Sequence, residues 1–124
     1  MKRLLVVEDD PTIMSLIVIL LEREGFEVIQ ATSAEEGIKL AAEQAPNLIL
    51  MDVALPGMDG LEATRLLKSR EATSRIPVVA LTAQAMKQDA ERAALAGCDG
   101  FIVKPISTRH FLGEVARFLS EEPG

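Results

Sequence analysis

The chain has 124 residues, 48% of them hydrophobic, and its 13 lysines and arginines against 19 acidic residues give a formal net charge of −6. This length and composition fit one domain with a sizeable core. The acidic balance argues against a nucleic-acid-binding surface, which needs clustered positive charge. No apolar run approaches the roughly 20 residues of a membrane-spanning helix, and no signal peptide is recognisable, so we expect a cytoplasmic protein that does not insert into membranes.

Short apolar runs rich in β-branched residues alternate with longer helical periodicities, and the alternation repeats five times. The predicted strands are residues 3–8, 26–30, 47–52, 77–82 and 100–104. This alternation is typical of βαβ units and predicts an α/β fold in which helices cover both faces of a parallel sheet. The second run, FEVIQ, alternates polar and apolar residues and suits a sheet edge. We expect residues 1–124 to form a single domain with no output domain.

Capping signals mark the predicted helices. Asp10 followed by Pro11 gives the first helix an N-cap and a proline at its first position, and Gly25 ends it. Ser33 and Glu36 form a capping box for the second helix. The other helices are predicted over residues 60–70, 83–96 and 107–120.

Polar side chains stand at the carboxyl ends of four predicted strands. They are Glu8, Asp9 and Asp10 after the first strand, Asp52 after the third, Thr82 after the fourth and Lys104 after the fifth. Parallel strands bring these ends to one edge of the sheet, where ligands of open α/β sheets bind. Each residue taken alone has an ordinary structural explanation, such as a helix cap or a turn. Together they form a chemically complementary set.

Carboxylates that converge repel one another unless a cation lies between them. Hard oxygen ligands that leave room for water suit Mg²⁺. A divalent ion, the Lys104 ammonium and the Thr82 hydroxyl would together stabilise phosphoryl oxygens. Asp52 is therefore predicted to be a nucleophile that takes up a phosphoryl group as an acyl phosphate.

Four motifs, VVEDD, LILMDVALPGMDG, PVVALTA and GFIVKP, resemble the receiver domains of two-component response regulators (the CheY-like family) in order and spacing. The resemblance covers Met1 to about Leu119, and the stretch TAQAMKQDAERAALAGCDGFIVKPIS is most similar to stand-alone, DivK-type receivers. It implies a flavodoxin-like, five-stranded parallel sheet in the order 2-1-3-4-5. It also implies a signalling domain that a histidine kinase or phosphotransfer protein phosphorylates, and that assists its own phosphoryl transfer and slow dephosphorylation.

The same resemblance implies the metal ligands. Glu8 and Asp9 would form the acidic pair, Asp9 and Asp52 would ligate Mg²⁺ directly, and the carbonyl of Ala54 would be a further ligand. Asp10 is then left as a helix cap. A cis peptide between Lys104 and Pro105 is also implied by the resemblance.

A conformational switch follows from the resemblance as well. Thr82 and Lys104 would contact the phosphoryl oxygens, Thr82 would move toward them, and Phe101 would turn inward, unless Phe101 is an ordinary core residue. The side chains of Ala54 and Gln84 would control access of water to the acyl phosphate. The fourth helix should be weakly held, because its inner stripe consists mostly of small residues. That stripe is Met86, Ala90, Ala93 and Gly97.

Two surfaces are candidate partner sites. The first helix carries one apolar stripe expected to face the sheet, namely Ile13, Leu16, Ile17 and Leu20. A second stripe, consisting of Met14, Val18 and Leu21, either widens the core face or docks on a histidine-bearing donor. A downstream protein target is expected at the face of the fourth helix, fifth strand and fifth helix. In the last helix, the apolar residues Phe111, Leu112, Val115, Phe118 and Leu119 favour core packing, and His110 is expected to be solvated.

Three other functions share parts of this pattern. A flavin carrier would need a loop rich in Gly, Ser and Thr after the first strand, where this chain has EDDP. An Asp-nucleophile phosphatase would need a DxD motif on the first strand, which is absent. A degenerate, phosphate-independent binding module is disfavoured by the complete set of acidic, Thr and Lys residues. Cys98, the only cysteine, is expected to be a buried structural thiol.

Overall fold

The computed structural model describes residues 2–83 and 87–119 of the chain. Its strands are β1 (Arg3–Val7), β2 (Glu27–Ala31), β3 (Leu48–Asp52), β4 (Val78–Thr82) and β5 (Gly100–Val103). All neighbouring strands pair in parallel, in the order β2-β1-β3-β4-β5. The predicted sheet, its strand order and the edge position of the second strand are confirmed.

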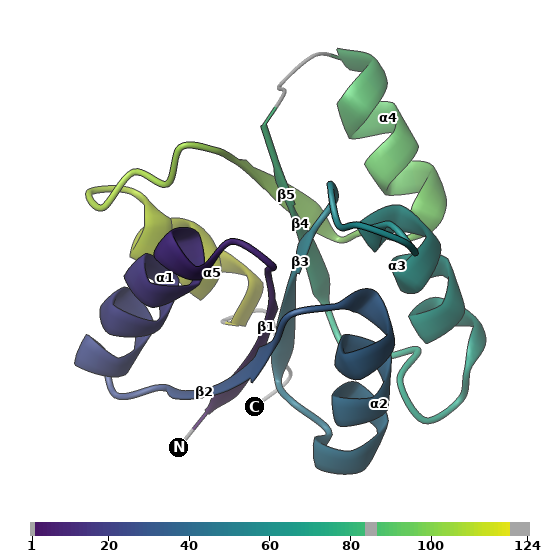
Figure 1. Cartoon of the computed structure of the whole chain (residues 1–124), viewed down its shortest axis with the longest axis horizontal. Helices are drawn as coiled ribbons and strands as arrows, with labels where there is room; N and C mark the ends of the chain where they lie inside the picture. The colour runs from purple at the N-terminus through teal and green to yellow at the C-terminus, as the bar shows by residue number, and fades with distance from the viewer. Residues whose placement is uncertain (1, 84–86, 120–124) are drawn as a thin grey trace.

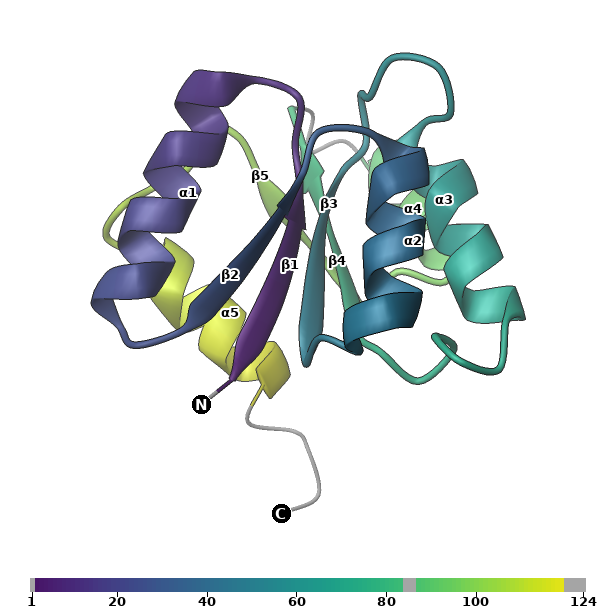
Figure 2. The same ribbon diagram turned by 60° about the horizontal axis from the view of Figure 1, so that its bottom comes forward.

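Helices cover both faces of this sheet. The described helices are α1 (Pro11–Arg23), α2 (Ala34–Gln44), α3 (Gly60–Ser69), α4 (Lys87–Ala96) and α5 (Phe111–Leu119). Helices α1 and α5 lie on one face, and α2, α3 and α4 lie on the other, as Figure 1 and Figure 2 show. The carboxyl ends of β1, β3 and β4 therefore meet at one edge of a three-layered domain. No described helix is long and apolar enough to cross a membrane.

The strands alternate between the two faces, as the pleat requires. In β1, Leu4 and Val6 pack toward α1 and α5, whereas Leu5 and Val7 pack toward α2 and α3. The central strand β3 is buried along its whole length, Asp52 included. A parallel sheet with helices on both faces produces this near-continuous apolar strand.

The predicted helix starts are confirmed for α1 and α2. The Asp10 carboxylate accepts hydrogen bonds from the amides of Thr12 (2.8 Å) and Ile13 (3.2 Å). The Ser33 hydroxyl accepts one from the Glu36 amide at 3.2 Å. Each side chain satisfies amide groups that have no partner within the helix.

The last helix begins later than predicted. The Ser107 carbonyl accepts hydrogen bonds from the amides of both His110 (3.2 Å) and Phe111 (2.9 Å). Residues 107–110 therefore form a separate turn, and α5 starts at Phe111. His110 is exposed, as predicted, and its Nδ1 lies 3.1 Å from the Ser107 hydroxyl.

The second apolar stripe of α1 widens the core face, which is one of the two interpretations that the sequence left open, and Ile17 and Leu20 of the first stripe are buried as predicted. Met14 and Leu21, placed in the outer stripe by the sequence, are 5% and 0% exposed and belong to the core shared with α5. Val18 is half-buried and packs against the same core. Because α1 packs against both the sheet and α5, its buried face is wider than one stripe. A donor-docking surface that uses Met14 and Leu21 is therefore excluded in this fold.

Helix α4 rests on small side chains. Ala93 and Ala96 are buried against Ala80 and Leu61. Gly97 ends the helix with φ of +102°, a backbone conformation that glycine adopts without strain. The predicted inner residue Met86 lies outside the described residues. Since alanines bury little apolar area, the packing of α4 contributes less than that of the other helices.

Core packing is confirmed for the last helix and only partly for the cysteine. Phe111, Val115 and Leu119 are buried, and Phe118 lies against Gly100, where an added Cβ would overlap its ring. Cys98 is half-buried rather than buried, and burial raises the pKa of its thiol.

Candidate functional site

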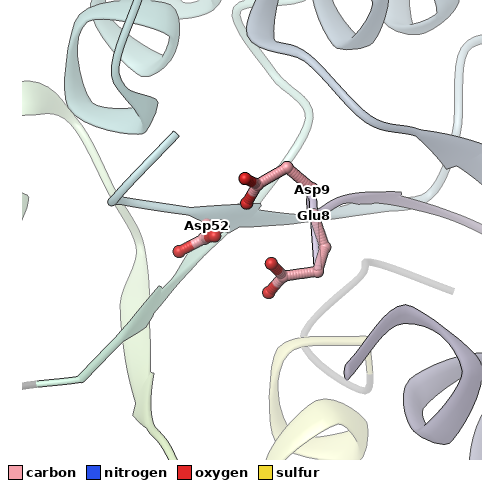
Figure 3. A group of neighbouring side chains, drawn as sticks. All are labelled: Glu8, Asp9 and Asp52. Carbon is pink, nitrogen blue, oxygen red and sulfur yellow. The ribbon is translucent and has the colours of Figure 1, made fainter. Parts of the chain in front are cut away.

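Three carboxylates converge where β1 and β3 end. Glu8, Asp9 and Asp52 each offer one oxygen, and these oxygens lie within 4.8 Å of one another. The three side chains point toward a shared space in Figure 3. Glu8 and Asp52 are only 1% and 3% exposed, whereas Asp9 is exposed. Buried carboxylates so close together need a compensating positive charge.

Lys104 supplies one such charge from the end of β5. Its Nζ lies 2.8 Å from Oε1 of Glu8 and 3.2 Å from Oδ1 of Asp52. The backbone holds the residue in register, because the Lys104 amide donates to the Thr82 carbonyl at 2.7 Å. The Lys104–Pro105 peptide is cis, as the resemblance implied.

Burial and neighbouring charges shift the pKa values of Glu8 and Lys104. Burial raises the pKa of Glu8 above its usual value, and the Asp52 carboxylate adds to this, although Lys104 and the Asp10 amide oppose it. For Lys104, burial alone lowers the pKa, but the neighbouring carboxylates of Glu8 and Asp52 outweigh burial, so the pKa is raised. One lysine thus stabilises the carboxylates only in part.

The carboxylates fit a hard divalent cation. Although Lys104 lies within ion-pair distance, Oε1 of Glu8 receives no well-aligned hydrogen bond within residues 2–83 and 87–119. Asp9, the exposed member, opens the cluster to solvent. Three carboxylate oxygens with open access to water match the ligands that Mg²⁺ prefers. Asp10 faces elsewhere and caps α1, as predicted.

The chain folds back closely on Asp52. The Ala54 amide donates to Oδ1 of Asp52 at 3.1 Å, and the Gly60 amide donates to the Val53 carbonyl at 3.1 Å. A Cβ on Gly60 would overlap the carbonyl oxygen of Asp52. Only glycine permits this approach, so Gly60 fixes the backbone that carries the Asp52 carboxylate. The sequence analysis did not identify Gly60, and the MDG turn before α3 was the available signal.

A cleft of about 250 Å³ lies beside Asp52. It is lined by Asp52, Val53, Ala54, Thr82, Ala83, Asp89 and Arg92. The structure therefore brings Thr82 and Ala54 next to Asp52, as predicted, and adds two charged residues of α4 that the sequence analysis missed. Gln84 lies outside the described residues.

Phe101 lies farther from the carboxylates. Its side chain is 38% exposed, and it lines a small cavity of about 30 Å³ together with Thr82. Asp89 and Arg92 line this cavity as well as the larger cleft. The carboxylate site and the Phe101 side chain are thus connected through one set of shared residues.

Comparison with known proteins identifies the family. Residues 4–116 match the response regulator receiver domain. The chain belongs to this family. The polar-differentiation response regulator DivK of Brucella ovis is 43% identical over 120 residues, which cover 97% of this chain and 98% of that protein.

Solved receiver structures agree with the fold and the site. The receiver domain of a Pseudomonas aeruginosa sensor histidine kinase, with a magnesium ion coordinated in its active-site cleft, gives a TM-score of 0.89 at 31% identity, covering 97% of this chain and 98% of that chain. The chemotaxis protein CheY4 of Vibrio cholerae gives a TM-score of 0.91 at 25% identity, covering 96% of this chain and 99% of that chain. The flavodoxin-like, CheY-like fold and the likeness to DivK are confirmed.

Family membership makes two-component signalling the function of the receiver domain. Such domains signal rather than catalyse, and their partners are histidine kinases or phosphotransfer proteins. Receiver domains typically bind Mg²⁺ at an acidic pocket, and a carboxylate cluster occupies that place here. The flavin-carrier and phosphatase interpretations are set aside.

Proposed function

We propose that Asp52 is the phosphoryl acceptor of this receiver domain. The observation that carries the proposal is the arrangement around it: a buried carboxylate within 4.8 Å of Glu8 and Asp9 oxygens and 3.2 Å from the Lys104 ammonium. Mg²⁺ would be held by Asp9 and Asp52, with Glu8 behind them and the Ala54 carbonyl as a further ligand. When bound, the ion neutralises charge on the phosphoryl oxygens.

The chemistry is a transfer between two nucleophiles. A carboxylate oxygen of Asp52 forms a bond to phosphorus while the P–N bond of the donor phosphohistidine breaks. The electron pair stays on the ring nitrogen, and the donor leaves as neutral imidazole when its other nitrogen carries a proton. Lys104, already beside the acceptor, and Thr82, which lines the same cleft, would contact the phosphoryl oxygens and stabilise the developing charge.

We propose that the switch between Thr82 and Phe101 requires movement of α4. The cavity beside Phe101 measures about 30 Å³, whereas an engineered protein cavity that binds benzene measures about 150 Å³. Phe101 therefore has no room to turn inward in this conformation. Helix α4, which packs mostly through alanines, is the element that can shift to make room. The alternative role of Phe101 as an ordinary core residue is disfavoured by its 38% exposure.

A downstream target would dock on the face of α4, β5 and α5. Leu95 of α4 is 85% exposed and Phe101 of β5 is 38% exposed. A cleft of about 200 Å³ on α4 and β5 is lined by Ala90, Ala93, Ala94, Cys98, Asp99, Gly100 and Phe101. We propose that the domain acts in the cytoplasm through such docking. The acyl phosphate would be lost by slow self-catalysed hydrolysis.

Intact-mass spectrometry after incubation with acetyl phosphate tests this function. We expect one phosphoryl adduct that requires Mg²⁺ and disappears in Asp52→Asn. Asp59→Asn is the matched control, since Asp59 lies in the same loop, caps α3 through the Glu62 amide at 2.8 Å, and asparagine caps equally well. An adduct that persists in Asp52→Asn would contradict the assignment. So would a wild-type protein that forms no adduct and binds no beryllofluoride, which would favour a phosphate-independent module.

A further inference from the structure

Two charged residues of α4 face the site from across the cleft. Arg92 and Asp89 line the cleft of about 250 Å³ that contains Asp52, and both also line the cavity of about 30 Å³ that contains Phe101. Among the described residues, Val53 and Thr82 also line both spaces. A change of charge at Asp52 therefore acts directly on the charged residues of α4, in addition to any effect that passes through Thr82.

Neither charged side chain has a polar partner among the described residues. Within residues 2–83 and 87–119, the side chains of Asp89 and Arg92 form no hydrogen bond or ion pair. They lie three positions apart on one helix, so they occupy neighbouring places on the same face. Arg92 is exposed and Asp89 is half-buried, which leaves the guanidinium free to move.

We propose that Arg92 is a second cationic contact for the phosphoryl group, and that Asp89 opposes this contact in the unphosphorylated state. The inference rests on the proposed phosphorylation of Asp52. A guanidinium binds phosphoryl oxygens through two parallel hydrogen bonds, a geometry that lysine cannot provide. Asp89 lies beside Arg92 as a local counter-charge and repels a phosphoryl group at Asp52.

This pair gives α4 an electrostatic reason to move. A phosphoryl group brings about −1.5 to −2 charges into the cleft. Arg92 would be drawn toward it and Asp89 pushed away, and both forces act on the helix that packs mostly through alanines. A shift of α4 in this sense changes the cavity that Phe101 lines. The helix that responds to the phosphoryl charge would thus be the same helix that must move to make room for the Phe101 ring.

Beryllofluoride with Mg²⁺, an analogue of the phosphoryl group, tests the proposal at equilibrium. Since the chain has no Trp or Tyr, binding is best followed by amide and arginine side-chain NMR signals. We expect Arg92→Gln to bind about two- to fivefold more weakly and Asp89→Asn to bind tighter by a similar factor, as for exposed ion pairs. Arg92→Lys should recover part of the loss, and all differences should shrink at 1 M salt.

Matched controls separate this role from a structural one. Glu91→Gln removes a neighbouring exposed charge of α4 that does not line the cleft, and Arg65→Gln removes an exposed arginine of α3. Both should bind as wild type does. Opposite effects of Arg92→Gln and Asp89→Asn support the proposal, because a general loss of stability would weaken both.

Two negative results differ in meaning. If wild type binds beryllofluoride while Arg92→Gln and Asp89→Asn match it, or if both weaken binding, the role of α4 is overturned and the proposed function stands. If wild type fails to bind in the presence of Mg²⁺, both proposals are overturned.

Discussion

The Nζ of Lys104 lies 2.8 Å from Oε1 of Glu8, and this ion pair joins the carboxyl end of the edge strand β5 to that of the inner strand β1. The Glu8 side chain is almost fully buried, and the Lys104 side chain is 16% exposed. A buried carboxylate is tolerated here because an ammonium group reaches it across two intervening strands.

Removal of the ammonium should destabilise the fold. In Lys104→Met, without Mg²⁺, we expect the free energy of unfolding to fall by about 2 to 3 kcal/mol, because Glu8 and Asp52 are left buried without their cation. Addition of Glu8→Gln should restore most of this loss. Urea denaturation in EDTA measures both changes, and Lys39→Met, at an exposed position of α2, is the control. Additive effects of the two substitutions would contradict the coupling.

The raised pKa of Glu8 predicts a pH dependence of stability. The folded state keeps the Glu8 proton to a higher pH than the unfolded state, whose usual value is 4.5. The stabilising contribution is complete below that value and is lost as pH rises through the raised pKa. Glu8→Gln should therefore become more stable than wild type as pH increases from 4.5 toward neutrality, in EDTA.

Urea unfolding over this pH range checks the prediction. Glu43→Gln, at an exposed position of α2, should show no such gain. If Glu8→Gln is less stable than wild type at neutral pH, then the pairing of Glu8 with Lys104 outweighs the cost of burial.

Asp9 and Asp10 form a natural test of the metal site, because they are adjacent and only Asp9 joins the carboxylate cluster. Mg²⁺ at 100 times its dissociation constant should stabilise the wild-type fold by about 2.7 kcal/mol. Asp9→Asn should lose at least about half of this gain. Asp10→Asn should retain it, since asparagine still caps α1. Thermal denaturation with and without Mg²⁺ measures the difference, and equal responses of the two variants would exclude Asp9 as a ligand.

Gly60 should be required for the position of Asp52. In Gly60→Ala the new methyl group would overlap the Asp52 carbonyl. We expect a loss of about 1 to 3 kcal/mol in stability, and a loss of phosphorylation rate of tenfold or more because the acceptor is displaced. Gly113→Ala in α5 is the matched control, since nothing lies within 4 Å of its new Cβ.

Gly113→Ala should stabilise the protein by about 0.5 to 1 kcal/mol, because alanine is the better helix former. Phosphorylation by acetyl phosphate, followed by intact mass, should be unchanged in this control. Normal phosphorylation of a folded Gly60→Ala variant would show that the backbone adjusts without moving the carboxylate.

Much of the fold was determined by local sequence. The apolar runs predicted the strands within about one residue, because a strand buried on both faces leaves an unbroken hydrophobic signature. Asp10 and Ser33 predicted helix starts because a cap bonds only to amides two or three residues away. The start of α5 was predicted too early. Residues 107–110 look helical in sequence, but they form a separate turn, in which the Ser107 carbonyl accepts hydrogen bonds from two amides.

The residues of the candidate site could likewise be predicted only in part. Glu8, Asp9, Asp52, Thr82 and Lys104 could be predicted because parallel topology carries strand ends to one edge, whatever the details of packing. The contact of Gly60 with Asp52 depends on how a loop closes. The positions of Asp89 and Arg92 depend on how α4 lies across the cleft, and the burial of Met14 and Leu21 depends on the contact between α1 and α5. Periodicity indicates that a helix has an apolar face, whereas its rotation and its neighbours are set by packing against elements distant in the chain.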